Sequence, residues 1–325
     1  MYKILFILLF FSQITFAQIA VKDSITQYPV SYATISFGNG NGLFADDEGK
    51  FIFTKKLYPD IDSLFISALG FKDLNISTLH LPEQLLLQPQ ASELDEIVIG
   101  TKLNRKFKEE TLKPYLDDDY YNCWLPTIES EIAVYFPKST TKNQQLSSVI
   151  FPIALESKDW GKRKRSNSEK KKFSTLFKVK FYANNNGIPG KVLTYETIVF
   201  RATEKDGDAH TLSVEDYDIY IPKNGFFVSL QVMGYTDRNG KLLPNKKYKE
   251  IKSKDGGVIK IPTNFRPLLP FTDEVETKNT YIKRVFINGN NWLKFDKGIG
   301  FKSSLLDKEL YNYGIGLSYK TFKDD

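Results

Sequence analysis

Short runs in which apolar and polar residues alternate recur along this chain, and they constrain its fold more than any other feature. One such run, "STLFKVKFYA", places Phe177, Val179 and Phe181 on one side and Lys178 and Lys180 on the other. Successive side chains of a β-strand point to opposite faces of its sheet. The run therefore predicts a strand with an apolar face in a core and with both lysines on a face open to water.

Further runs of this kind follow one another between turn signals, and a high content of Phe and Tyr also favours strands. They include "PVSYATISF", "KFIFTKK", "ESEIAVYFP", "KVLTYETIVFRA" and "GFFVSLQVMGY". We predict an all-β protein with two β-sandwiches, a seven-stranded antiparallel one over residues 18–100 and a larger, jelly-roll-like one over residues 125–325. Residues 101–124 are more charged and favour helix, so we expect a linker with one short helix there.

The N-terminal segment has the composition of a secretory signal peptide. "MYKILFILLFFSQITFAQ" has one early cation, Lys3, then an apolar run from Ile4 to Phe11, and then small residues before Gln18. The run is well short of the roughly 20 apolar residues that a membrane-spanning helix requires. We therefore expect a signal peptide over residues 1–17 and an exported chain that begins near Gln18, with no transmembrane segment, in the periplasm, on the outer-membrane surface or outside the cell.

A glycine-rich stretch, "NGNGLFADDEGKFIF", allows three readings. A phosphate loop needs its glycines between a strand and a helix, whereas the segment after Gly38 to Gly42 alternates like a strand. An EF-hand calcium loop needs oxygen ligands at alternate positions, whereas the carboxylates of residues 46–48 are consecutive. We interpret Gly38 to Gly42 as a flexible connection and Gly49 as the glycine of a plain turn, with the carboxylates of the turn in solvent.

The first quarter of the chain resembles the carboxypeptidase-regulatory-like domain, a transthyretin-like seven-stranded sandwich common in exported proteins of the Bacteroidetes type. The segments that carry the resemblance are "VKDSITQYPVSYATISF", "GLFADDEGKFIF", "DSLFISALGFKDLNI", "LLLQP" and "LDEIVIG". The resemblance implies an accessory fold without an activity of its own. The positions that match the pattern are Asp23, Pro29, Val30, Ala33, Ile35, Asp47, Gly49, Phe51, Gly70, Phe71, Leu94, Glu96 and Val98.

Few residues suggest catalysis. His210 has Asp206 and Ser213 nearby in sequence, and a hydrolase triad needs such groups within reach of one another. Any polar hairpin offers similar residues, so this spacing alone does not indicate a triad. Glu129 and Glu131 share a strand face, as glycosidase carboxylates would, but we interpret them as solvent-face residues. No His, Cys and Asp cluster has the spacing of a zinc site. We predict no catalytic residue, no cofactor and no metal site, with Ca²⁺ at the acidic segments Asp117–Asp119 and "DGD" as the alternative to solvated loops.

The best candidates for ligand contacts are tryptophans and a basic run. The net charge of +6 is mild and supports weak attraction to anionic glycans or lipid headgroups. The run "KDWGKRKRSNSEKKK" has one aromatic residue, Trp160, whereas nucleic-acid binding favours several aromatic residues interleaved with the cations. We therefore expect no nucleic acid and interpret the run as a mobile loop. The residues that we assign as candidate ligand contacts are Trp124, Trp160, Trp292, Lys162, Arg163 and Arg165.

Three classes of function remain open. The first is a secreted, non-enzymatic cell-envelope accessory or binding protein, whose partner is an envelope glycan or another envelope protein; in this class we expect carbohydrate binding. The second is a hydrolase whose site is built from loops of the C-terminal sandwich. The third is an outer-membrane-associated component related to the N-terminal modules of TonB-dependent receptors, suggested by "LDEIVIG". Charged and Pro-rich stretches such as "IKIPTNFRPLLPFTDEVETK" argue against a membrane barrel.

Overall fold

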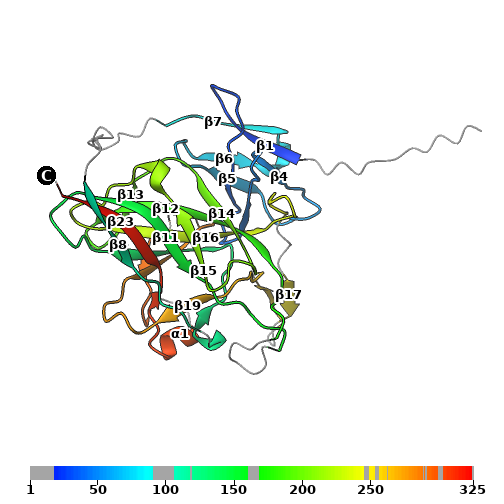
Figure 1. The fold of residues 1–325 in the computed structure, drawn as a ribbon. Helices are drawn as coiled ribbons and strands as arrows, with labels where there is room; N and C mark the ends of the chain where they lie inside the picture. Colours follow the sequence, from blue (N-terminus) through cyan, green and yellow to red (C-terminus); the bar gives the residue numbers. More distant parts are fainter. Residues whose placement is uncertain are drawn as a thin grey trace, which may run out of the picture.

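The chain is almost entirely β-structure in a computed structural model (Figure 1), which confirms the predicted all-β class. The structure describes residues 18–90, 106–117, 119–159, 168–244, 249–252, 256–261, 263–287, 289, 291–298 and 303–323. Within these ranges one α-helix is present, the four-residue α1 (Ser304–Asp307). We call residues 18–90 the first unit and the described residues from 106 onward the second unit.

The first unit has seven strands in two sheets. They are β1 (Gln18–Asp23), β2 (Thr34–Ser36), β3 (Gly42–Phe44), β4 (Lys50–Ile52), β5 (Ser63–Ser67), β6 (Leu74–Ser77) and β7 (Gln84–Leu87). One sheet has the order β4-β1-β7 and the other β3-β2-β5-β6. Alternate residues of both sheets, such as Val21, Ile35, Leu64 and Leu87, are buried in one core.

Two features of the first unit differ from the sequence-based expectation. Strands β1 and β7 pair in parallel, so the unit is not purely antiparallel. Strand β3 was not expected. It begins at Gly42, the last residue of the predicted flexible connection Gly38 to Gly42, and Gly42–Phe44 pairs with Thr34–Ser36 of β2. The segment "LDEIVIG", expected as the last strand, lies outside the described residues.

A large sheet dominates the second unit. Its order is β13 (Ile188–Val192), β12 (Ser174–Asn185), β16 (Phe226–Tyr235), β10 (Ser130–Phe136), β20 (Thr280–Arg284) and β21 (Leu293–Lys294), and β14 (Ile198–Thr203) also pairs with β12. The inner face carries Phe177, Val179 and Phe181, all buried in the main core as the alternation predicted.

Smaller sheets complete the second unit. One has the order β15 (Ala209–Ser213), β11 (Gln144–Pro152), β23 (Gly316–Phe322) and β8 (Phe107–Leu112). A second consists of β22 (Asn312–Tyr313), β19 (Leu269–Thr272) and β9 (Cys123–Trp124), and β17 (Lys249–Lys252) forms a hairpin with β18 (Val258–Ile261). Val149 and Phe151 of β11 and Leu317 of β23 are buried in the same core as the large sheet.

The described part of the expected linker over residues 101–124 contains strands β8 and β9. Its one short helix is the three-residue 3-10 helix Tyr120–Asn122, and no α-helix is present in this part. Strand β8 pairs along its whole length with β23, and the rings of Phe107 and Phe322 lie 6.4 Å apart. Local propensity favours helix in "FKEETL", but pairing with a strand more than 200 residues away outweighs it, as tertiary context often does. The second unit therefore begins by residue 107.

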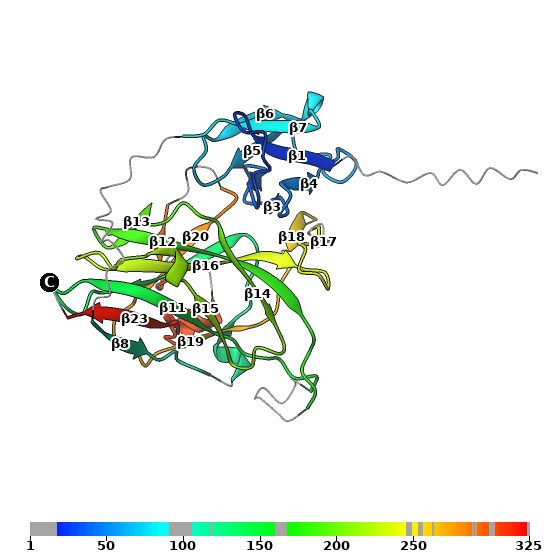
Figure 2. The ribbon, with the colours of Figure 1, turned by 45° about the horizontal axis from the view of Figure 1, so that its top comes forward.

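The first unit covers part of the outer face of the large sheet. Figure 2 shows its strands lying above β12, β16 and β20. The prediction that Lys178 faces water is wrong, because the first unit lies over this lysine and leaves it only 8% exposed. Lys180, two residues further along β12, keeps 26% of its side chain exposed.

Candidate functional site

The two units meet along a contact that we call the seam, and its centre is Phe286 of the second unit. The carbonyl oxygen of Phe286 accepts hydrogen bonds from Ser36 Oγ at 2.8 Å and from the Gly40 amide at 3.1 Å. Its ring lies 5.3 Å from the ring of Phe44, which is buried in the core of the second unit. A Cβ on Gly42 would lie 2.3 Å from the Phe286 ring, so only glycine allows this approach.

Charged residues join the units at another part of the seam. Lys241 Nζ lies 3.2 Å from Glu48 Oε2 and 3.5 Å from Asp46 Oδ2, and Lys50 pairs with Glu48 at 2.9 Å. The bonds from Lys50 and Lys241 hold the pKa of Glu48 below its ordinary value. The bond to Glu48 likewise raises the pKa of Lys241. Exposed ion pairs contribute little free energy. This cluster therefore affects how the two units are oriented at the seam more than how stably they associate.

The turn at Gly49 has the predicted conformation, but one of its carboxylates is buried. Gly49 has φ of +70°, which confirms the turn. Asp46 is only 8% exposed, and its Oδ1 accepts the backbone N–H groups of Glu48 and Lys50. The expectation of solvated carboxylates is therefore wrong for Asp46, whereas Asp47 is exposed as predicted.

A pocket of about 350 Å³ opens beside this turn, and we call it the seam pocket. Its volume lies in the range of small-molecule sites. Most of its wall is apolar, and the polar groups of Asp46, Lys50 and Lys241 gather at one part of it. The full lining is Gln18, Leu43, Phe44, Asp46, Lys50, Phe51, Ile52, Leu57 and Tyr58 from the first unit and Lys241, Leu242, Leu243 and Pro244 from the second.

A buried carboxylate organises the outer face of the large sheet. Glu131 Oε1 accepts hydrogen bonds from Tyr182 Oη at 2.8 Å and Ser229 Oγ at 2.7 Å, and Lys180 Nζ lies 3.4 Å from Oε2. Burial opposes the ionisation of Glu131, but Lys180, Lys283 and the two hydroxyl donors outweigh it, so the pKa lies below its ordinary value. Glu131 is therefore a fixed anion that holds two lysines.

Glu129 is buried as well, so the interpretation of Glu129 and Glu131 as solvent-face residues is wrong. Glu129 is 2% exposed, and neither carboxylate oxygen has a hydrogen-bond partner among the described residues. The Nε2 group of Gln231, the residue opposite Glu131 on β16, also has no hydrogen-bond partner among the described residues. Both glutamates are buried because they lie on the outer face of the large sheet, which other parts of the chain cover here. No shared partner joins the two carboxylates as a catalytic pair.

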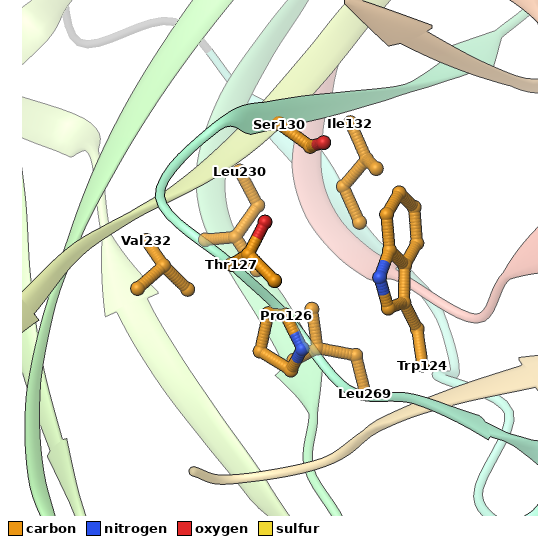
Figure 3. A pocket seen from close by; sticks show the side chains of 8 residues that line it. All are labelled: Trp124, Pro126, Thr127, Ser130, Ile132, Leu230, Val232 and Leu269. Atoms are coloured by element: carbon orange, nitrogen blue, oxygen red, sulfur yellow. The ribbon is translucent and has the colours of Figure 1, made fainter. Parts of the chain in front are cut away.

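The candidate tryptophans lie in different surroundings. Trp292 is half-buried near two residues that interact with Glu131. Lys283 Nζ lies 5.8 Å from the centre of the Trp292 ring, and the Tyr182 ring meets it edge-on with the ring centres 5.6 Å apart. Trp124 stacks near Phe295 and lines a cavity of about 10 Å³ between strands, with room for no more than about one water molecule (Figure 3). The other four candidates, Trp160, Lys162, Arg163 and Arg165, lie outside the described residues.

The histidine cluster does not form a triad. His210 Nδ1 lies 2.7 Å from Asp206 Oδ1, and its ring stacks on Phe200 at 4.3 Å. Burial opposes the ionisation of Asp206, but the bonds from His210 and Thr203 outweigh it and lower the pKa. Ser213 lies three residues along β15 and so projects from the opposite face. His210 therefore caps an aromatic stack in this structure.

The two acidic segments considered for calcium come together. Asp117 and Asp208 both line a pocket of about 370 Å³ in the second unit. Asp117 Oδ1 accepts the Asp119 amide, and its Oδ2 accepts from the Asn122 side chain, so both oxygens already serve the local turn. Within the described ranges, no group of three or more His, Cys, Asp or Glu side chains has an arrangement that holds a metal ion.

Sequence reasoning missed the residues that make the seam. Phe286 and Lys241 lie more than 190 residues from their first-unit partners, so no local pattern identifies them. Lys178 follows the alternation of a solvent-facing lysine and becomes buried only through docking. Among the residues that the structure describes, no helix is long and apolar enough to span a membrane.

Comparison with known proteins adds little to this geometry. No family model matches the chain, and no curated protein matches it. A solved structure to which the chain is similar is that of the cysteine protease and lectin-like domains of a surface layer associated protein of Clostridium difficile, at 11% identity and a TM-score of 0.32. The match covers 66% of this chain and 36% of that chain. Such a TM-score is too low to transfer fold or function, so the proposals below rest on residues of this chain.

Proposed function

We propose that this chain is an exported cell-envelope protein that acts by binding rather than by catalysis, and that its ligand occupies the seam pocket. The observation that carries the proposal is the pocket of about 350 Å³ whose walls come from both units. The signal-like N-terminus supports export, and the resemblance of the first quarter to an accessory β-module supports a role without catalysis. We further propose that the first unit is such a module.

The chemistry of the pocket indicates an amphipathic ligand. Leu57, Tyr58 and Leu243 supply apolar surface that remains accessible, and Leu243 is 44% exposed. Lys50 and Lys241 supply positive charge, which Asp46 and the neighbouring Glu48 balance. A ligand with an apolar body and a polar or zwitterionic end, such as part of an envelope glycan conjugate or of an envelope protein, fits this arrangement.

A fluorescent amphipathic probe tests the pocket directly. Anilinonaphthalene sulfonate has an aromatic body and one anionic group, and it should bind the full chain through the seam pocket. Leu243→Asp places a carboxylate in the apolar wall. Because Leu243 is 44% exposed, the probe can cover only that part of the leucine, and the loss of about 1 kcal/mol of burial should weaken probe binding about fivefold. Leu79→Asp is the matched control, because Leu79 is a 75% exposed leucine outside the pocket.

The comparison of Leu243→Asp with Leu79→Asp can contradict the proposal. Equal probe affinity in the two variants would place the binding elsewhere and contradict the proposal. A glycan array, run beside esterase and glycosidase substrates, then separates the classes of function. Turnover of any substrate would contradict a non-catalytic role, and a glycan signal lost in Leu243→Asp but kept in Leu79→Asp would identify the ligand class.

A further inference from the structure

Lys178 holds an ammonium group inside the seam. It projects from the outer face of β12 and is 8% exposed beneath the first unit. Its Nζ donates to the backbone carbonyl oxygen of Tyr32 at 2.7 Å and lies 5.6 Å from the centre of the Phe44 ring. An ammonium has three N–H donors, so one carbonyl and one ring face replace only part of its hydration. Burial of this group is therefore costly.

The charged neighbours of Lys178 do not compensate for its burial. Lys180 on the same strand repels it, and Glu131, two strands away on β10, attracts it. Glu131 already interacts with Lys180, Lys283, Tyr182 and Ser229. From the first unit the facing groups are the Tyr32 carbonyl and the Phe44 ring, neither of which carries a charge. As a result, burial lowers the pKa of Lys178 from 10.5 to about 7.

We propose that docking of the first unit on the second, and with it the seam pocket, is controlled by protonation of Lys178. The neutral amine favours the docked arrangement, and the charged ammonium favours separation, because separation returns Lys178 to water. The statement about the pocket rests on the proposed function above, whereas the statement about docking stands on the seam alone.

The sign of the effect follows from proton linkage. The docked state gives up its Lys178 proton near pH 7, and the separated state keeps it until about pH 10.5, so the separated state binds more protons in this window. Docking must therefore strengthen as pH rises from about 7 towards 10, by up to about tenfold in the equilibrium constant per pH unit for one proton. Below pH 7 Lys178 adds no further pH dependence to docking, because its amine is charged in both the docked and the separated state.

Hydrogen exchange at the seam measures docking in the full chain without a ligand. The Gly40 amide donates to Phe286 across the seam, so its protection reports the docked state. We expect its protection factor, corrected for the intrinsic pH dependence of exchange, to rise by up to about tenfold per pH unit between pH 7 and 9. A flat profile in the wild-type chain would overturn the proposal without reference to any variant.

Two variants assign the effect to one group. Lys178→Met keeps the length of the side chain without its charge, so protection should be high and independent of pH. Lys191→Met is the control, because Lys191 is an exposed lysine of β13 in the same sheet and should leave the wild-type slope unchanged. A wild-type slope that persists in Lys178→Met would also overturn the proposal.

The probe experiment separates this inference from the proposed function. If both are right, affinity for anilinonaphthalene sulfonate rises with pH in the wild-type chain and not in Lys178→Met. If exchange at Gly40 follows pH as expected but probe affinity does not change, proton-linked docking stands and the coupling to the seam pocket is refuted.

Discussion

Replacement of Gly49 by alanine tests how the turn at the seam is built. Gly49 has φ of +70°, and a Cβ there would lie 2.6 Å from the Val21 carbonyl oxygen and 3.2 Å from the Val30 amide nitrogen. These atoms belong to the centre of the first unit. The Val21 amide donates to Gly49 O at 2.8 Å, and the Val30 amide donates to Val21 O at 2.9 Å. An alanine therefore strains its own backbone and displaces a paired carbonyl.

The two costs can be added. A side chain in the left-handed region costs about 1–2 kcal/mol. Displacement of the Val21 carbonyl weakens two backbone hydrogen bonds, each of which contributes about 0.5–1.5 kcal/mol. We therefore expect Gly49→Ala to lower the free energy of unfolding of the first unit by about 2–5 kcal/mol, a large effect for one methyl group.

A second glycine of the same unit isolates the steric part of this cost. Gly70 has φ of +83°, but a Cβ there would meet nothing within 4 Å. Gly70→Ala should therefore cost only the conformational part, about 1–2 kcal/mol. Urea unfolding of the full chain, followed by circular dichroism and analysed with a common slope, gives the difference between the two variants.

The comparison can refute the reasoning in two ways. If Gly49→Ala destabilises no more than Gly70→Ala, the contact with Val21 does not limit the turn. If neither variant destabilises, the left-handed conformation at these glycines is wrong.

Two further predictions concern buried carboxylates. Asp46→Ala removes the acceptor of two backbone amides and should destabilise by about 1–3 kcal/mol, whereas Asp47→Ala, at an exposed position, should stay within about 0.5 kcal/mol in the same urea experiment. Thermal melts with calcium and with chelator should coincide, and a calcium-dependent rise lost in Asp46→Ala would identify a metal loop instead. Glu131→Gln leaves Lys180 and Lys283 without their shared anion and should destabilise by about 3–5 kcal/mol. Glu109→Gln, at an exposed position of β8, is its control, and equal stability of the two variants would show that Glu131 does not hold the lysines.

Periodicity along single strands was readable from the sequence. The alternation of β12 assigns Phe177 and Phe181 to one face and Lys178 and Lys180 to the other. As predicted, both phenylalanines face the core and both lysines lie on the opposite face. The turn at Gly49 was also readable, because glycine tolerates a positive φ that other residues resist. In both cases the information lies within a few residues, where backbone geometry alone decides the outcome.

Long-range pairing decided the rest of the fold. The sequence "FKEETL" favours helix but becomes β8, because β23 offers a strand edge at the opposite end of the chain. Likewise, Gly42 was expected to end a flexible connection, but it begins strand β3 (Gly42–Phe44), which pairs with β2. Hydrogen bonding to a distant partner outweighs a propensity that differs by only a fraction of a kcal/mol per residue.

The sequence by itself determined which residues can share a face, and only the tertiary structure decided whether that face meets water. Lys178, Glu129 and Glu131 have the pattern of solvent-facing residues, yet all three are buried. The burial of Lys178 depends on a second apolar surface, centred on Phe44 and Phe286, that brings the first unit onto the large sheet, whereas Glu131 is enclosed by Tyr182, Ser229 and Lys180 of its own sheet. Because that surface is assembled from segments more than 240 residues apart, its effect on the charged groups beneath it cannot be read from any one of them.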